Sequence, residues 1–223
     1  MPFDKTRVIY HGVPVAADAE PTPSRDFPVV GCPARFEKRK GLEILVKAMA
    51  AVIQYYPDAQ LRLAGSGPTG YSSVIKDLVR SLGLERNVKI QGFCDTPIAF
   101  LRDLDVFAFA SNSEGFGIVL IEAMSMRLPI VASDIYPINH IVQHGKSGML
   151  VEPRNPQVFA TAIVDLFSKP QLRQAMGEAG FQRCVEEFSL ERSLSKVHDL
   201  YLELMVAKSG ADDRASGIPP LSR

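Results

Sequence analysis

The feature that most constrains this chain is an alternation of short apolar segments with longer amphipathic ones, which begins at Val29. The run Val29-Val30-Gly31-Cys32 has the apolar character of a buried strand, whereas residues 42–53 carry apolar side chains at helical spacing. Strands that alternate with helices predict βαβ units, and therefore a parallel sheet covered on both faces. The sequence thus predicts an α/β fold with a Rossmann-like, doubly wound sheet. The six predicted strands are residues 29–34, 60–64, 88–93, 105–110, 129–133 and 148–152.

Predicted helices fill the intervals between these strands, and three more follow the last strand. The first of these three begins at Asn155-Pro156, an N-cap residue followed by proline in the first turn. The predicted domain covers residues 29–207. Residues 1–28 are interpreted as an interdomain segment with a proline-rich linker, and residues 208–223 have the composition of a disordered tail.

The bulk composition argues against several classes of protein. Lysine and arginine together number 25, as do aspartate and glutamate, so the net charge gives no reason to expect nucleic acid as a partner. No apolar run approaches the length of about 20 residues that a transmembrane helix needs, and residues 1–12 do not resemble a signal peptide. The three cysteines include no Cys-x-x-Cys pair, which is typical of reduced thiols in a cytoplasmic protein.

The first candidate site is the segment that leaves the first predicted strand. In a doubly wound sheet the carboxyl ends of the strands, and any ligand, lie along one edge. The segment 34–41 carries four cations in six positions. Arg35 offers a planar guanidinium, and Lys40 a point charge at the start of the next helix, whose free amides also attract phosphate. Taken alone, the segment fits either a phosphate-binding loop or a solvated basic loop.

The second candidate follows the fourth predicted strand and reads Glu114-Gly115-Phe116-Gly117-Ile118. The glycines let the backbone approach a ligand closely, and the amides after Glu114 would point outward from the start of the next helix. Glu122 lies inside that helix between apolar residues, where a carboxylate needs a partner such as two ribose hydroxyls. The alternatives are a buried salt bridge for Glu122 and a helix-stabilising charge for Glu114.

A third loop, residues 65–70, formally matches the dinucleotide-binding fingerprint G-x-G-x-x-G. That interpretation requires an acidic residue at the end of the next strand, but this strand ends Gln91-Gly92. The loop also follows the second strand of the domain rather than the first. We therefore favour a tight turn beside a ligand over an NAD site. No histidine pair has a matching acid on a clear helix, and we expect neither a metal nor a cofactor.

Together these motifs resemble the C-terminal domain of family 4 retaining glycosyltransferases of the GT-B fold. The resemblance covers residues 29 to about 204, with the motifs in the family's order. They are Arg35 with Lys40-Gly41, Gly65-Ser66-Gly67-Pro68, Gly92-Phe93, Glu114-Gly115-Phe116-Gly117 with Glu122, Pro129 to Asp134, and Gly145-x-x-Gly148. The resemblance implies transfer of a sugar from a nucleotide diphosphate to an acceptor hydroxyl, with retention at the anomeric carbon and without a metal.

The resemblance also implies a role for each site residue. Arg35 and Lys40 would neutralise the diphosphate of the donor, and Glu114 would face the donor sugar. Glu122 would hold the ribose, and the loop at Phe93 would frame the base. The remaining donor-binding positions implied by the family are Gly65, Gly67, Gly115, Phe116, Gly117 and Ile118.

The sequence departs from the family in three places. His140 stands where an acid is usual, Arg127 where glycine is common, and His11 in place of an asparagine in the segment that opens the domain. The resemblance also implies an N-terminal domain that binds the acceptor, and often the membrane, and we expect this domain to be missing from the chain. The implied partners are therefore the nucleotide-sugar donor and this missing domain, and the chain alone should transfer sugar poorly. The final helix, which normally packs on that domain, should expose apolar side chains. Two alternatives keep the fold: a nucleotide-sugar epimerase, and a non-catalytic nucleotide- or partner-binding module.

Overall fold

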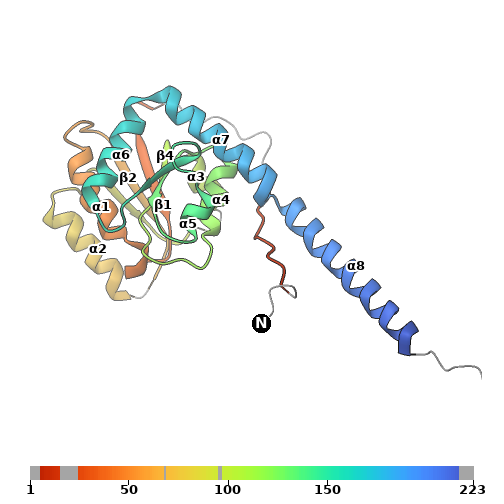
Figure 1. Ribbon diagram of the computed structural model, residues 1–223. Helices are drawn as coiled ribbons and strands as arrows, with labels where there is room; N and C mark the ends of the chain where they lie inside the picture. The colour runs from red at the N-terminus through yellow and green to blue at the C-terminus, as the bar shows by residue number, and fades with distance from the viewer. Residues whose placement is uncertain (1–5, 16–24, 68, 95–96, 216–223) are drawn as a thin grey trace, which may run out of the picture.

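The computed structural model describes residues 6–15, 25–67, 69–94 and 97–215, which form a single parallel sheet with helices on both sides (Figure 1). The strand order is β3-β2-β1-β4-β5-β6, which is that of a doubly wound fold. Successive strands are added outward from β1 on one side and then outward from β4 on the other, so the order of addition reverses between β1 and β4. All six predicted strands are confirmed, and every pairing is parallel. The strands are β1 (Val29–Pro33), β2 (Gln60–Ala64), β3 (Val88–Gln91), β4 (Val106–Phe109), β5 (Ile130–Ser133) and β6 (Gly148–Val151).

The central strands β4 and β5 are buried along their whole length, because helices cover both faces of the sheet. Their sequences are correspondingly apolar without a period of two, as parallel strands require. Three helices pack together on one face: α1 (Leu42–Val52), α2 (Thr69–Ser81) and α6 (Pro156–Ser168). The helices grouped around α4 cover the other face, and they are α3 (Pro97–Arg102), α4 (Ile118–Ser125), α5 (Ile138–Ile141) and α7 (Pro170–Phe188).

The predicted start of α6 is confirmed in detail. The Asn155 side chain accepts hydrogen bonds from the backbone amides of Gln157 at 3.2 Å and Val158 at 3.4 Å, and Pro156 occupies the first turn. These bonds satisfy amides that otherwise have no partner at a helix start. The cap places Arg154, three residues after the end of β6, at the carboxyl edge of the sheet.

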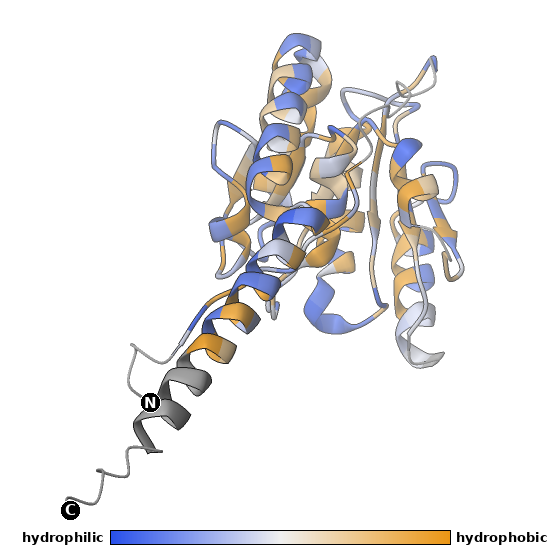
Figure 2. Cartoon of the chain, turned by 90° about the vertical axis from the view of Figure 1, so that its right-hand side faces the viewer, coloured by the Kyte–Doolittle hydropathy of each residue, from blue (hydrophilic) through white to orange (hydrophobic). Residues whose placement is uncertain are grey.

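The last helix, α8 (Leu190–Ala215), differs from the prediction for the tail. We predict disorder from residue 208, but the helix continues to Ala215, because the segment after Lys208 contains several good helix formers and one glycine. Residues 216–223 lie outside the described residues. Figures 1 and 2 show α8 extending away from the body of the domain, with apolar residues along it. The exposed apolar side chains expected on this helix are confirmed, and include Leu194, Tyr201, Leu204 and Met205.

The N-terminal segment packs on the junction between α7 and α8. The amide of Val13 donates to the carbonyl of Phe188, and the amide of Leu190 donates to the carbonyl of Val13, both at 2.9 Å. Gly12 permits this contact, because a Cβ atom there would lie 2.5 Å from the carbonyl oxygen of Ser189. The pairing brings His11 to the start of α4, more than a hundred residues away in sequence. Of the predicted linker, residues 1–5 and 16–24 lie outside the described residues.

Candidate functional site

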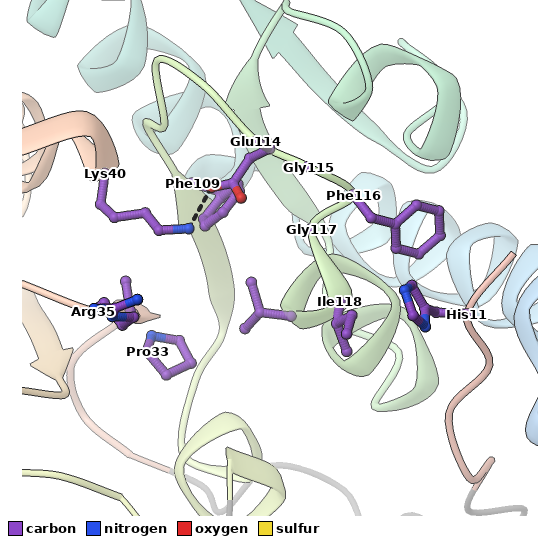
Figure 3. A pocket seen from close by; sticks show the side chains of 12 residues that line it. His11, Pro33, Arg35, Lys40, Phe109, Glu114, Gly115, Phe116, Gly117 and Ile118 are labelled. Atoms are coloured by element: carbon purple, nitrogen blue, oxygen red, sulfur yellow. Dashed lines mark hydrogen bonds and ion pairs between the residues drawn. The ribbon is translucent and has the colours of Figure 1, made fainter. Parts of the chain in front are cut away.

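Two adjoining cavities open at the carboxyl edge of the sheet, where the strand order reverses between β1 and β4. The first, here called the Lys40 cavity, encloses about 490 Å³ and is also lined by Glu114 and the residues that follow it (Figure 3). The second, the Glu122 cavity, encloses about 340 Å³. Ligands of doubly wound sheets bind at this point of the topology. The residues that line both cavities are Pro33, Ala34, Arg35, Ile118 and Val119.

Lys40 and Glu114 line the first cavity and form a largely buried ion pair (Figure 3). The ammonium nitrogen of Lys40 lies 2.5 Å from Oε1 of Glu114, which also accepts a hydrogen bond of 2.6 Å from the hydroxyl of Ser111. Only 12% of the Lys40 side chain and 6% of the Glu114 side chain are exposed. Glu114 therefore belongs to a fixed, charged network rather than acting as a free charge at a helix start.

A tight turn after β1 aims Lys40 at Glu114. A single 3-10 turn, Lys38–Lys40, ends at Gly41, whose φ is 62°. A Cβ atom on Gly41 would lie 2.1 Å from the carbonyl oxygen of Ala110, so the loops after β1 and β4 can meet only if this residue is glycine. In the predicted Lys40-Gly41 pair, the glycine is thus required by packing and the lysine supplies the charge.

Arg35 lies at the mouth shared by both cavities, and 73% of its side chain is exposed. Its guanidinium is 2.8 Å from Oε1 of Glu37. A hydrogen bond from Arg39, together with the nearby positive charges, lowers the pKa of Glu37, so this carboxylate is ionised at neutral pH. Because Arg35 is exposed and Glu37 also pairs with Arg39, the Arg35–Glu37 contact costs little to separate, and the Arg35 guanidinium can turn toward a bound anion.

The start of α4 presents backbone amides to the Lys40 cavity. Gly117, the residue before this helix, has a φ of 99°, which only glycine adopts readily. Within the described residues the amides of residues 115–119 donate no hydrogen bond, whereas the amide of Leu120 donates to the carbonyl of Gly117 at 2.9 Å. Amides of this kind, at the positive end of a helix dipole, attract anions.

Glu122 lies half buried in α4 and faces the second cavity. Among the described residues its carboxylate has neither an ion pair nor a hydrogen bond, so the salt bridge that the sequence left open is not formed. Burial raises the pKa of Glu122 above its ordinary value. A half-buried carboxylate without a partner is a cost to the folded protein that a ligand could offset.

This cost gives a test on the ligand-free chain, in which Glu122→Gln should raise the free energy of unfolding at neutral pH. The gain should shrink as the pH falls toward 4.5, the ordinary pKa, because below that pH the carboxyl is protonated in both folded and unfolded chains. Urea unfolding between pH 4 and pH 8 measures the difference, with the exposed Glu186→Gln as the matched control. An equal gain at every pH would mean that ionisation of Glu122 is not its cause.

The glycine loop after β2 contributes to the site in only one of its two predicted positions. Gly65 lines the Glu122 cavity with a φ of 140°, and a Cβ atom there would lie 2.0 Å from the carbonyl oxygen of Ala34. Gly67 lines neither cavity, and its glycine is explained by close packing against the backbone of Phe36. Phe93 lines the Glu122 cavity with 74% of its surface exposed. Pro68 lies outside the described residues.

Several lining residues are not among the site residues predicted from the sequence. The clearest is His11, whose ring lies 5.5 Å from that of Phe116 and borders the Lys40 cavity. It reaches the site only because the N-terminal segment pairs with the α7–α8 junction, which no local pattern predicts. Phe109 and Val119 were likewise indistinguishable from ordinary core residues of a strand and a helix. His140, by contrast, lines neither cavity and instead bonds the hydroxyl of Tyr10 at 2.6 Å.

The departure from the family at residue 127 has a backbone explanation. Arg127 has a φ of 55°, in the left-handed region that favours glycine. Its guanidinium carbon lies 3.6 Å from the centre of the Phe181 ring, and its Nε atom donates to Glu178 at 3.0 Å. These contacts from α7 offset the backbone cost. Arg127 lines neither of the two cavities.

The part of the chain that the structure describes contains no cluster of three or more histidine, cysteine or acidic side chains placed to hold a metal ion. Burial raises the pKa of the Cys32 thiol, next to the site in β1, to about 12, so it is not a nucleophile at neutral pH. None of the described helices is both long enough and apolar enough to cross a membrane.

Comparisons with known proteins agree with this architecture. The chain is 32% identical over 183 residues to a D-inositol 3-phosphate glycosyltransferase of Corynebacterium urealyticum, covering 79% of this chain and 43% of that protein. A Bacillus anthracis protein named N-acetyl-alpha-D-glucosaminyl L-malate synthase is 30% identical, with 77% and 44% covered. The chain thus spans about half the length of the curated relatives it matches.

Solved structures show the same relationship. Sucrose-phosphate synthase from Thermosynechococcus elongatus superposes with a TM-score of 0.79 at 30% identity, covering 90% of this chain and 53% of that one. Anabaena HepE, in a complex with UDP, superposes with a TM-score of 0.75 at 26% identity, covering 80% and 49%.

These neighbours define the class, because the fold is that of a Rossmann-like domain of GT-B glycosyltransferases. The sequence profile of the family described as Glycosyl transferases group 1 matches residues 17–183, and the chain belongs to that family. The predicted GT-B fold and the predicted membership of a glycosyltransferase family are therefore confirmed. Neither the epimerase nor the non-catalytic alternative is favoured by these matches.

Proposed function

We propose that this chain is the donor-binding half of a retaining glycosyltransferase and that its two cavities hold a nucleoside diphosphate sugar. The observation that carries the proposal is the convergence of three anion- and hydroxyl-binding features at one edge of the sheet. Lys40 with Arg35, the free amides before α4, and the unpartnered Glu122 carboxylate all border two adjoining cavities. A diphosphate with an attached ribose matches this order of groups.

In this proposal the diphosphate binds at the mouth shared by the cavities. Arg35, Lys40 and the amides of residues 115–118 neutralise it, and Glu122 accepts hydrogen bonds from the ribose. The base lies near Phe93, whose exposed ring can stack on it. The donor sugar then extends into the Lys40 cavity, beside Glu114 and His11. The UDP complexes of Anabaena HepE make uridine the first base to test.

The chemical step requires breaking the bond between the anomeric carbon and the diphosphate. Negative charge develops on the leaving oxygen, and fixed cations and amides stabilise it without having to reorganise. We propose that the acceptor hydroxyl is held by a further domain, since the curated relatives are about twice as long as this chain. Without that domain the reacting atoms are not held together, so this chain should bind donor but transfer sugar poorly.

Thermal unfolding with UDP, GDP, ADP and NAD tests the donor site. A nucleotide at about one hundred times its Kd adds roughly 2.7 kcal/mol of stability, which for a domain of this size raises the Tm by roughly 5–10 °C. We expect one nucleoside diphosphate, but not NAD, to give this shift, and Arg35→Ala to reduce it strongly. Arg86→Ala, an exposed arginine outside both cavities, should leave it unchanged. A shift with NAD alone would overturn the proposal.

A further inference from the structure

A third cavity at the same edge of the sheet is rich in cations that the proposed function does not use. It encloses about 730 Å³ and is lined by Lys38, Arg39, Lys47 and Arg154, with Glu43 as its one acidic residue. We call it the basic hollow. The four cations come from the turn after β1, from α1 and from the loop after β6, so three separate segments bring like charges to one place.

The basic hollow lies beside the Lys40 cavity and is separate from it. Successive residues point to different sides: Arg39 lines the hollow and Lys40 the cavity, while Ser113 lines the hollow and Glu114 the cavity. The Lys40–Glu114 pair therefore forms the partition. A guanidinium nitrogen of Arg39 lies 3.9 Å from Oε2 of Glu114 and links the two sides.

Little negative charge balances the hollow from within the protein. Lys38 and Lys47 form no ion pair among the described residues, and Arg154 has only a neutral partner, the side-chain oxygen of Asn112 at 3.2 Å. Glu43 is already engaged, because it accepts a hydrogen bond from the hydroxyl of Tyr71. Arg39 is neutralised by Glu37 at 2.8 Å. Three cations thus share the hollow with a single carboxylate, which favours binding of an anion.

The backbone around the hollow adds one donor and fixes a cation. At the start of α1 the amides of Gly41 and Ile44 already donate to the carbonyls of Lys38 and Gly41, whereas the amide of Glu43, which also lines the hollow, has no partner among the described residues. Arg154 has a φ of 63°, a conformation uncommon for arginine, and its bond to Asn112 holds the guanidinium against the loop after β4. The hollow therefore combines one free backbone amide with several placed cations, and both kinds of group bind phosphate in proteins.

We propose that the basic hollow binds a phosphate group carried by the sugar acceptor. This inference rests on the proposed function, in which the donor sugar already occupies the Lys40 cavity on the other side of the Lys40–Glu114 pair. A second phosphate site next to the donor sugar is where an acceptor would be anchored. The substrate class is accordingly a phosphorylated polyol or sugar rather than a neutral one.

The test uses the full chain saturated with UDP, so that the donor site is filled. Glycerol 3-phosphate, inorganic phosphate and glycerol are then titrated by calorimetry. We expect glycerol 3-phosphate to bind and glycerol not to bind, with affinity that falls as salt is added. The variant Lys47→Gln/Arg154→Asn should weaken binding about tenfold or more, because two charge-assisted contacts are lost. Asparagine is chosen because it tolerates the left-handed backbone.

The matched control is Lys76→Gln/Lys89→Gln, which removes two exposed cations that do not line the hollow. It should bind glycerol 3-phosphate as the parent chain does, and both double variants should bind UDP normally. No binding to the UDP-saturated chain, or equal loss in both variants, overturns the inference. Binding of inorganic phosphate without glycerol 3-phosphate overturns the acceptor assignment. Displacement of UDP by phosphate would place the ion in the Lys40 cavity, and failure of UDP itself to bind would instead count against the proposed function.

Discussion

Lys40→Met is expected to lower the free energy of unfolding by about 3 kcal/mol, the order of loss seen when one partner of a buried ion pair is removed. The reason is Glu114, whose side chain is 6% exposed and would keep Ser111 as its remaining hydrogen-bond partner. The same variant should lose binding of UDP at millimolar concentration, because the proposed diphosphate site then lacks its buried cation. Urea unfolding and calorimetry measure the two effects separately.

A second variant separates the structural role of Lys40 from its proposed role in binding. In Lys40→Met/Glu114→Gln no buried charge is left, and glutamine can still accept the hydrogen bond from Ser111. We expect most of the lost stability to return, since a buried pair can be replaced by neutral groups at little cost, whereas UDP binding should stay absent. The exposed Lys76→Met is the control for both measurements. If the double variant bound UDP as the parent chain does, Lys40 would be a structural residue only.

The fold could be predicted from the sequence because its signals are local. Each buried parallel strand corresponds to a short apolar run, and the start of α6 corresponds to the pair Asn155-Pro156. Each of these features can therefore be recognised from a few consecutive residues. The end of α8 could not, because helix propensity and disorder are nearly balanced after Lys208. A parallel sheet also places its strand ends on one edge, which is why Arg35 and Glu114 were expected together.

The details of the site depend on contacts between distant parts of the chain. Lys40 and Glu114 are separated by 74 residues, and no pattern in the sequence around either residue predicts that the two side chains pair with each other. The same holds for His11, which reaches the site through the α7–α8 junction, and for Arg154, which completes the basic hollow. For Glu122 the sequence left a salt bridge and a ligand contact open, and only the three-dimensional surroundings show that no salt bridge forms.

Glu122→Ala should weaken UDP binding about 100-fold while leaving the affinity for inorganic pyrophosphate nearly unchanged. Two hydrogen bonds from ribose hydroxyls to an ionised carboxylate contribute roughly 3 kcal/mol or more, which corresponds to this factor. Pyrophosphate carries no ribose, so it depends only on Arg35, Lys40 and the amides before α4. Isothermal calorimetry with both ligands measures the two affinities, and the exposed helical residue Glu186 provides the matched control as Glu186→Ala.

The comparison of the two ligands decides what Glu122 does. If Glu122→Ala weakened the binding of UDP and of pyrophosphate equally, the substitution would act on the diphosphate site by disturbing α4, and not on contacts to the ribose. Unchanged affinity for both would leave the half-buried carboxylate without a role in donor binding. The expected result, a loss confined to the nucleotide, would explain why the chain keeps an ionisable group where burial raises its pKa and lowers stability. Glu122 would then be a residue whose cost to the free protein is offset only when the donor is bound.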